Sequence, residues 1–305
     1  MRPYIIAPYI IALILSVSPC SYGILFDSTG DSSFNTSAPT GEYANSGWQY
    51  QGSSSGTPIA SQYFLSAKHL GWSVGGSFWD AQNTRFTITD VYNNPNEDLT
   101  ICKVDGVFSS IAPLYTGSNE AGKLVVMFGK GAPRGTEVIN GTSRGWEWGG
   151  GLWNTLRWGT NEITSIVDSG STTWGHLLGA EFNHGASTTE GMLSGGDSGY
   201  GLFIEDGGIW KLAGINSCVD GPYSTQANFS NAFNAALYDE TGYYGDSFTG
   251  IVPMSGAGMF YTARVSSSME WIQGIAAVPE PSTVSLIAFG FIGLIFATYR
   301  YRVNI

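Results

Sequence analysis

Charged side chains are scarce in this sequence. They make up 12% of its 305 residues, about half the share found in an ordinary soluble domain. Thirteen Lys and Arg stand singly against 24 Asp and Glu, which gives a formal net charge of −11. Because no basic stripe or cluster is present, the composition argues against a nucleic-acid partner.

Cysteine and histidine are also rare. Three Cys are too few for a disulfide framework. Cys20 lies in an apolar N-terminal segment, and Cys102 and Cys218 could pair in an exported chain, although nothing in the sequence brings them together. The His residues form no H-x-x-x-H or C-x-x-C cluster with metal-ligand spacing; they are His69, His176 and His184. We therefore predict no metal site and no cofactor.

Glycine and aromatic residues are abundant instead. The chain has 42 Gly and 14% aromatic residues, and the Gly follow no triplet period, which excludes collagen. Short apolar or alternating runs are separated by Gly, Asn, Asp and Ser, a pattern typical of an all-β sandwich or barrel. The clearest runs are 63–67, 86–91, 99–104, 123–128, 201–205 and 210–215. One helix is expected at about 267–277, and loop is expected over most of 28–57.

Four Trp crowd residues 145–160, G-W-E-W-G-G-G-L-W-N-T-L-R-W-G-T. Two interpretations are open. The segment is either a loop that stacks on a sugar or another substrate, or a hairpin whose Trp side chains cover the core. The second interpretation is favoured.

The N-terminus has the pattern of a secretory signal peptide. Residues 4–17 are nearly all apolar and follow Arg2, and Ser21 and Gly23 occupy the −3 and −1 positions of a cleavage site. We predict that residues 1–23 are removed. A buried N-terminal strand and an uncleaved anchor are the alternatives.

The C-terminus combines three features in order. V-P-E-P-S-T at 278–283 leads into the apolar run 284–299, and Arg300 and Arg302 follow. The run rises about 24 Å as a helix, just enough to cross a thin bilayer, with the basic end in the cytoplasm. A plain membrane anchor would explain the run and the Arg residues alone.

The same order resembles the PEP-CTERM sorting tail, here residues 278–305. This resemblance implies a Gram-negative bacterium and an exosortase that cuts near 279–281. Removal of residues 1–23 and 282–305 takes away three Arg and no acid, which leaves a net charge of −14. Such a charge favours solubility and discourages binding to anionic surfaces.

Three residues could carry acyl-transfer chemistry. Ser198 lies in G-G-D-S-G, where flanking Gly allow a tight turn whose backbone N–H groups converge on one point. His69 ends the run F-L-S-A-K-H, and Asp98 opens D-L-T-I-C-K-V. Taken singly, each is also typical of an ordinary turn or surface residue.

Together, the order His69, Asp98, Ser198, each at a strand edge, resembles the chymotrypsin/trypsin-like serine proteases. F-L-S-A-K-H is similar to that family's hydrophobic-x-T-A-A-H segment, D-L-T-I-C-K-V to D-I-A-L-L-K-L, and G-D-S-G is its nucleophile motif. Further similar segments keep the family's order, so the resemblance covers nearly all of 24–277; they are 122–131, 210–217, 260–265 and 271–272.

The resemblance implies two six-stranded antiparallel β-barrels, about 24–118 and 119–277, with the active site in the cleft between them and a short C-terminal helix. It implies that Ser198 is the nucleophile, that His69 is the general base, and that Asp98 orients the imidazole.

Further roles follow from the same resemblance. The N–H groups of Gly196 and Ser198 would form the oxyanion hole, and Ser217 would support Asp98. The sequence departs from the family at Tyr200, where the motif usually continues with Gly-Pro, and at the two neighbours of His69. The family's common disulfides are missing, but no catalytic atom is lost.

The substrate pocket of the family aligns with three residues. Met192 falls at the floor of the pocket, and Ser217 and Val219 fall on its wall. A thioether cannot pair with a buried cation, so we expect a small or medium apolar residue at P1, the substrate residue before the scissile bond. A distant acid from the insertion at 220–259 could change this preference.

The family also uses a freshly cut N-terminus, whose ammonium pairs with the Asp before the nucleophile. Here the predicted cleavage would expose Ile24, and the partner would be Asp197.

The sequence thus predicts an exported serine endopeptidase that acts on peptides or proteins. Signal peptidase and an exosortase would process it. Residues 284–299 would hold it transiently at the inner membrane before it reaches the envelope, the surface or the medium. The alternative is a non-catalytic surface or matrix protein that uses a protease-like fold for binding.

Overall fold

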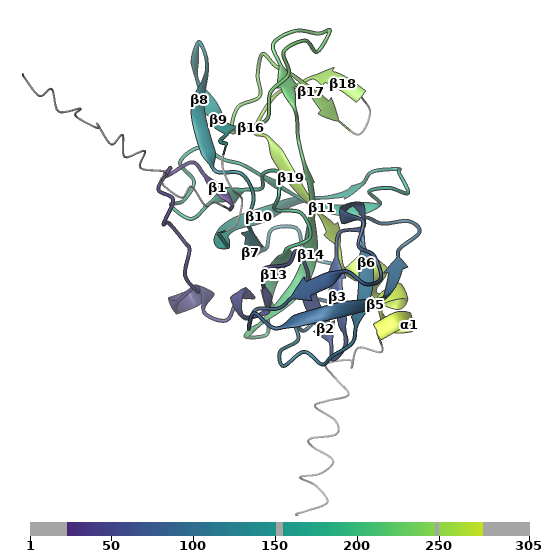
Figure 1. Cartoon of the computed structure of the whole chain (residues 1–305). Helices are drawn as coiled ribbons and strands as arrows, with labels where there is room; N and C mark the ends of the chain where they lie inside the picture. The colour runs from purple at the N-terminus through teal and green to yellow at the C-terminus, as the bar shows by residue number, and fades with distance from the viewer. Residues whose placement is uncertain (1–22, 151–154, 248–249, 277–305) are drawn as a thin grey trace, which may run out of the picture.

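The computed structural model describes residues 23–150, 155–247 and 250–276 (Figure 1). The predicted signal peptide up to residue 22 and the predicted sorting tail lie outside the described residues. Within the described ranges, no helix is long and apolar enough to cross a membrane.

The C-terminal half is a closed six-stranded antiparallel barrel, as expected. Its strand order is β10-β11-β19-β14-β13-β7. The strands are β7 (Leu124–Gly129), β10 (Arg157–Asp168), β11 (His176–Glu181), β13 (Gly201–Asp206), β14 (Ile209–Val219) and β19 (Met259–Arg264). Alternating apolar residues fill its interior, among them Met127, Ile163, Leu178 and Ala213, all fully buried.

The N-terminal half is a five-stranded sheet with the order β2-β3-β6-β5-β4. Its strands are β2 (Thr57–Ala60), β3 (Tyr63–Ser66), β4 (Ser77–Trp79), β5 (Arg85–Asn93) and β6 (Thr100–Val104). The all-β class is confirmed, but this half has one strand fewer than expected. The first strand of the chain, β1 (Leu25–Phe26), pairs instead with β12 (Gly191–Met192) beside the barrel.

Two small sheets extend the barrel half. One has the order β16-β9-β8 and the other β15-β17-β18. Figure 1 shows β8, β9, β17 and β18 at the end of the molecule opposite the N-terminal sheet. Their bounds are β8 (Arg134–Asn140), β9 (Thr142–Trp148), β15 (Tyr223–Ser224), β16 (Ala235–Leu237), β17 (Tyr244–Ser247) and β18 (Gly250–Pro253).

The helices are few and short. Four are 3₁₀ turns: η1 (Gly41–Tyr43), η2 (Trp48–Tyr50), η3 (Lys68–Leu70) and η4 (Ser266–Ser268). The one α-helix of the described residues, α1 (Met269–Ala276), begins and ends close to the predicted bounds. As expected, most of 28–57 is loop: the segment holds η1 and η2, and β2 begins only at its last residue, Thr57.

The two halves share one hydrophobic core. Leu65 and Ile101 of the N-terminal sheet belong to the same buried cluster as Val126 and Phe128 of the barrel, and Ile272 of α1 closes it. Because apolar side chains from both halves fill one interior, the halves are held in a fixed relation to each other.

We predict that Ile272→Ala lowers the free energy of unfolding by about 2–5 kcal/mol, because the fully buried side chain leaves a cavity in this shared core. Ile139→Ala, on an exposed β8 position, should change it by less than about 0.5 kcal/mol. Urea denaturation at a fixed pH measures both, and equal losses would contradict the shared-core assignment.

Candidate active site

His69 and Asp98 meet at one edge of the N-terminal sheet. Strands β3 and β6 pair with Ser66 opposite Thr100. His69 lies in η3, just after β3, and Asp98 lies two residues before β6, so the two residues lie side by side. The His69 backbone N–H donates to Asp98 Oδ1 over 2.9 Å. His69 Nδ1 lies 2.7 Å from Asp98 Oδ2.

The Asp98 carboxylate is almost completely buried, at 1% exposure, and it accepts a third hydrogen bond from the barrel. Ser217 Oγ, on β14, donates to Asp98 Oδ2 over 2.6 Å. Both carboxylate oxygens are therefore satisfied, and the bond to Nδ1 leaves the other imidazole nitrogen, Nε2, for a further partner. The ring is about one-third exposed, and Trp174 lies beside it at 6.2 Å between ring centroids.

Ser198 lies on the barrel side of the cleft, in the turn between β12 and β13. The turn needs glycine on either side, because Gly196 and Gly199 have φ of +97° and +83°. A Cβ on Gly199 would also lie 2.6 Å from Leu70 Cδ1, which shows how closely this turn approaches η3. In the part of the chain that the structure describes, no hydrogen bond joins Ser198 Oγ to His69.

The backbone of this turn has two free donors. Asp197 N bonds Ser194 O, and Gly199 N bonds Asn216 O. Within the described residues, the N–H groups of Gly196 and Ser198 donate to nothing. These two unpaired N–H groups, from the residues on either side of Asp197, could together bind an oxyanion.

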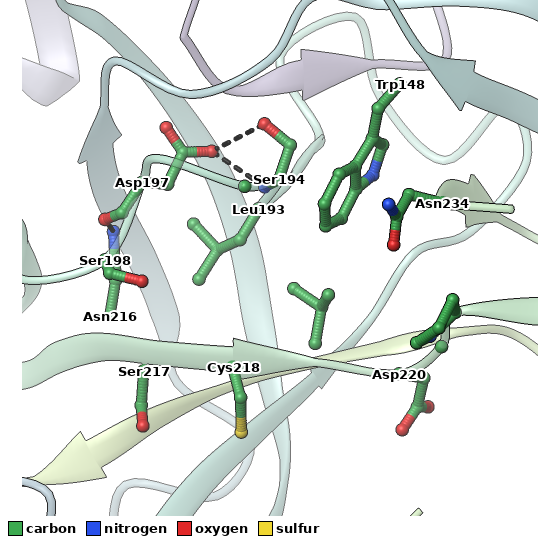
Figure 2. A pocket seen from close by; sticks show the side chains of 14 residues that line it. Trp148, Leu193, Ser194, Asp197, Ser198, Asn216, Ser217, Cys218, Asp220 and Asn234 are labelled. Carbon is green, nitrogen blue, oxygen red and sulfur yellow. Dashed lines mark hydrogen bonds between the residues drawn. The ribbon is translucent and has the colours of Figure 1, made fainter. Parts of the chain in front are cut away.

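Asp197 is fully buried and held by backbone groups. Gly131 N donates to its Oδ1 over 2.6 Å, and Ser194 N donates to its Oδ2 over 2.8 Å. Ser194 Oγ donates to the same Oδ2 over 3.1 Å, and Figure 2 shows both Ser194 bonds. Burial raises the pKa of Asp197 to about 7, because the desolvation of the charged carboxylate outweighs the hydrogen bonds from Ser194 and Gly131 and the attraction of Arg157.

Ile24, the residue directly before β1, is also fully buried. The preceding Gly23 packs against the Gly129 carbonyl group, and Gly129 packs in turn against the Asp197 carboxylate. In the uncut chain, Asp197 takes its hydrogen bonds from Gly131 and Ser194.

A pocket of about 250 Å³ opens beside Ser198. Its lining residues come from the turn, from β14 and from the small sheets; they are Trp148, Leu193, Ser194, Gly195, Asp197, Ser198, Asn216, Ser217, Cys218, Val219, Asp220, Gly221, Pro222 and Asn234. Ser217 and Val219 are among them, but Met192 is not. Met192 is fully buried in the barrel core, because β12 is paired with β1, and the lining begins at the next residue. Met192 is therefore not among the residues that line this pocket, and its role as the floor stays a prediction.

In the Trp-rich segment 145–160, one Trp agrees with the core-covering interpretation and another lies at a pocket. Trp158 packs in the shared core and donates its N–H to Ser37 O, as a core-covering hairpin predicts. Trp148 lines the pocket instead. Asn234, in the 220–259 insertion, also lines it, and no local signal in the sequence indicated this role.

Of the other Cys and His residues that the structure describes, Cys218 lines the pocket and Cys102, His176 and His184 do not. Cys102 and Cys218 are free thiols in different halves, so the possible pairing is not formed, and burial raises the pKa of each to about 12. His176 Nδ1 lies 2.7 Å from Glu97 Oε1, and His184 pairs with Asp27.

Comparisons with known proteins support two parts of this description. Residues 277–300 match the PEP-CTERM protein-sorting motif, which confirms the resemblance of the tail. Human heparin binding protein resembles the chain in two solved structures, at 18% and 19% identity, over 74% of this chain and 86% of that chain, with a TM-score of 0.43. A mutant of the same protein matches equally, at 18% identity. No curated protein sequence matches.

The six-stranded barrel, the second sheet that shares its core, and the His–carboxylate pair at their junction are all features of the trypsin-like fold. The chain therefore has a trypsin-like fold and carries a PEP-CTERM motif, the signal for export and a membrane-associated sorting step.

Proposed function

We propose that the protein is an exported serine endopeptidase that cleaves peptide bonds through an acyl-enzyme. The observation that carries the proposal is the arrangement around Ser198. Within the described residues, the N–H groups of Gly196 and Ser198 are unpaired, the turn that carries Ser198 packs closely against η3, and His69 of η3 is bonded to the buried Asp98. This combination supplies an oxyanion site and a general base at one point.

In the proposed reaction, Ser198 Oγ attacks the scissile carbonyl carbon while His69 Nε2 takes the hydroxyl proton. The carbonyl oxygen becomes an oxyanion that accepts hydrogen bonds from Gly196 N and Ser198 N. Asp98 holds the imidazole by Nδ1 and stabilises its charged form. His69 then protonates the leaving amine, and a water molecule, activated by the same base, hydrolyses the ester.

The proposed activating step uses the N-terminus. Cleavage after Gly23 would convert the nitrogen of the buried Ile24 into an ammonium. The backbone at Gly129, which packs against both Gly23 and the Asp197 carboxylate, lies between the two groups. A buried carboxylate without an ion-pair partner favours a cation nearby, because pairing removes the cost of burying its charge. Signal peptidase would then create the active form without a separate activating protease.

A non-catalytic binding protein is the second candidate. It is favoured by the missing hydrogen bond between Ser198 and His69 within the described residues. Bonds of this kind are commonly long until substrate binds, so the geometry alone does not exclude catalysis. A fluorophosphonate that labels Ser198 would support the enzyme, because only an activated Ser reacts.

The tail completes the proposal. An exosortase would cut near 279–281 after the inner-membrane step, and the body would then reside in the envelope, on the surface or in the medium.

We predict that Ser198→Ala and His69→Ala each reduce peptide hydrolysis by a factor of about 10⁴ or more, because nucleophile and base act as one unit. His176→Ala is the matched control, since that ring also lies 2.7 Å from a buried carboxylate but outside the pocket. Initial rates on a peptide mixture measure all three. Loss of activity in His176→Ala, with His69→Ala unaffected, would contradict the assignment.

We predict that protein beginning at Ile24 has a kcat/KM at least about tenfold higher than protein with extra residues before it. Asp197→Asn should be inactive although Ser198 is intact. An ammonium paired with a buried carboxylate has a pKa raised above its usual value near 8, so activity should be present below about pH 8 and lost as pH rises through the raised value. Equal turnover of the extended form would reject this activation step.

We predict that the uncut chain loses stability between about pH 4 and pH 7. The folded chain binds the Asp197 proton more tightly than the unfolded chain does, so this contribution is present at low pH and disappears as pH rises through the raised pKa of about 7. In urea denaturation at several pH values, the free energy of unfolding should fall less steeply with rising pH in Asp197→Asn than in Asp206→Asn, a control at an exposed position. Glu240, whose pKa burial raises to about 8, accounts for a residual slope. Equal slopes would contradict the prediction.

A further inference from the structure

One wall of the pocket beside Ser198 comes from outside the barrel. Trp148 ends β9, and its backbone N–H donates to Asn234 O over 3.0 Å, which continues the pairing of Glu147 with Ala235 in β16. The two residues are thus cross-strand neighbours in the small sheet. Their side chains lie together on the pocket wall (Figure 2).

The indole N–H of Trp148 is a buried donor without an acceptor. Figure 2 shows the Asn234 amide beside it. An Asn amide has one acceptor and two donors, and a half-turn about its terminal bond exchanges them. With Oδ1 turned to the indole N–H, the orphan donor is satisfied, since a buried polar group is costly only while it is unpaired. Asn234 Nδ2 then offers its hydrogens to the pocket.

The rest of the lining carries no counterion for a negatively charged ligand. No Lys, Arg or His is among the lining residues, so a carboxylate would be buried unpaired. The Asp197 carboxylate is occupied by Gly131 and Ser194. The Asp220 carboxylate points away from Trp148 and Leu193 in Figure 2, because it accepts hydrogen bonds from Met259 N and Tyr261 on β19.

We propose that this pocket selects a neutral amide side chain at P1, glutamine in preference to asparagine. Asn234 Nδ2 donates to the carbonyl oxygen of that side chain, and Leu193 and Val219 pack against its methylene groups. Trp148 is a positioning residue that holds the Asn234 amide in the donating orientation. The volume of about 250 Å³ suits a side chain of this size. The inference rests on the proposed function and deepens it, and it replaces the apolar preference that rested on Met192.

The test measures binding, so that it does not depend on turnover. Three peptides identical except for Gln, Met or Glu at P1 are titrated against the processed chain carrying Ser198→Ala, with the change in fluorescence anisotropy as the readout. Gln should bind about tenfold more tightly than the similarly long Met, and Glu should bind most weakly, because only Gln both accepts the hydrogen bond and stays uncharged.

The variants separate selectivity from folding. Trp148→Phe keeps the ring and removes the N–H, so the Gln-to-Met ratio of affinities should fall to about one while Met binding stays near its original value. Asn234→Leu should reverse the ratio in favour of Met. Trp146→Phe is the matched control: it lies in the same hairpin and outside the pocket, it bonds Asp27, and it should leave the ratio unchanged.

Equal or tighter binding of Met in the parent chain would overturn the inference, as would a ratio that Trp148→Phe and Asn234→Leu both leave intact. Neither result would affect the proposed chemistry, which the fluorophosphonate and the Ser198→Ala rates test separately.

Discussion

The buried carboxylate of Asp98 is the constraint around which the two halves are joined. It lies two residues before β6 and accepts hydrogen bonds from His69, which follows a strand of the N-terminal sheet, and from Ser217 in the barrel. A buried charge without such partners would cost several kcal/mol. The same bonds therefore satisfy the carboxylate, fix the orientation of the imidazole and connect the two halves.

A second buried carboxylate, that of Asp197, organises the turn that carries Ser198. Asp197 is enclosed by the backbone at Gly129 and Gly131, where a Cβ would collide with it. Its bonds to Gly131 N and Ser194 shape the turn that carries Ser198 and leave two N–H groups free. Burial and hydrogen bonding of one side chain thus determine where the nucleophile and its proposed oxyanion site stand.

The small sheets have a different role from the barrel. The barrel and the N-terminal sheet provide the shared core and the catalytic geometry, whereas the β16-β9-β8 sheet reaches the pocket only through the ends of two strands. Loops and added elements can change a pocket wall without disturbing the core that supports it. The proposed substrate preference therefore depends mainly on segments that contribute nothing to the proposed triad.

Several features could be predicted from the sequence because each is encoded by neighbouring residues. The alternating runs predicted the strands, the G-D-S-G turn needs glycine at positive φ, and the V-P-E-P-S-T tail is recognised as a contiguous motif. His69 and Asp98 could be proposed because each stands at the end of its own strand, and paired strands bring their ends together.

Other features were decided by contacts between distant segments. Met192 was placed in the core by pairing with β1, Cys102 and Cys218 were separated into different halves, and Trp148 came to the pocket by pairing beside Asn234. No local pattern encodes these outcomes, because burial and strand pairing depend on how the whole chain packs. The sequence by itself determined the strands, the turn and the tail of this protein, and only the tertiary structure decided which side chains line the pocket beside Ser198.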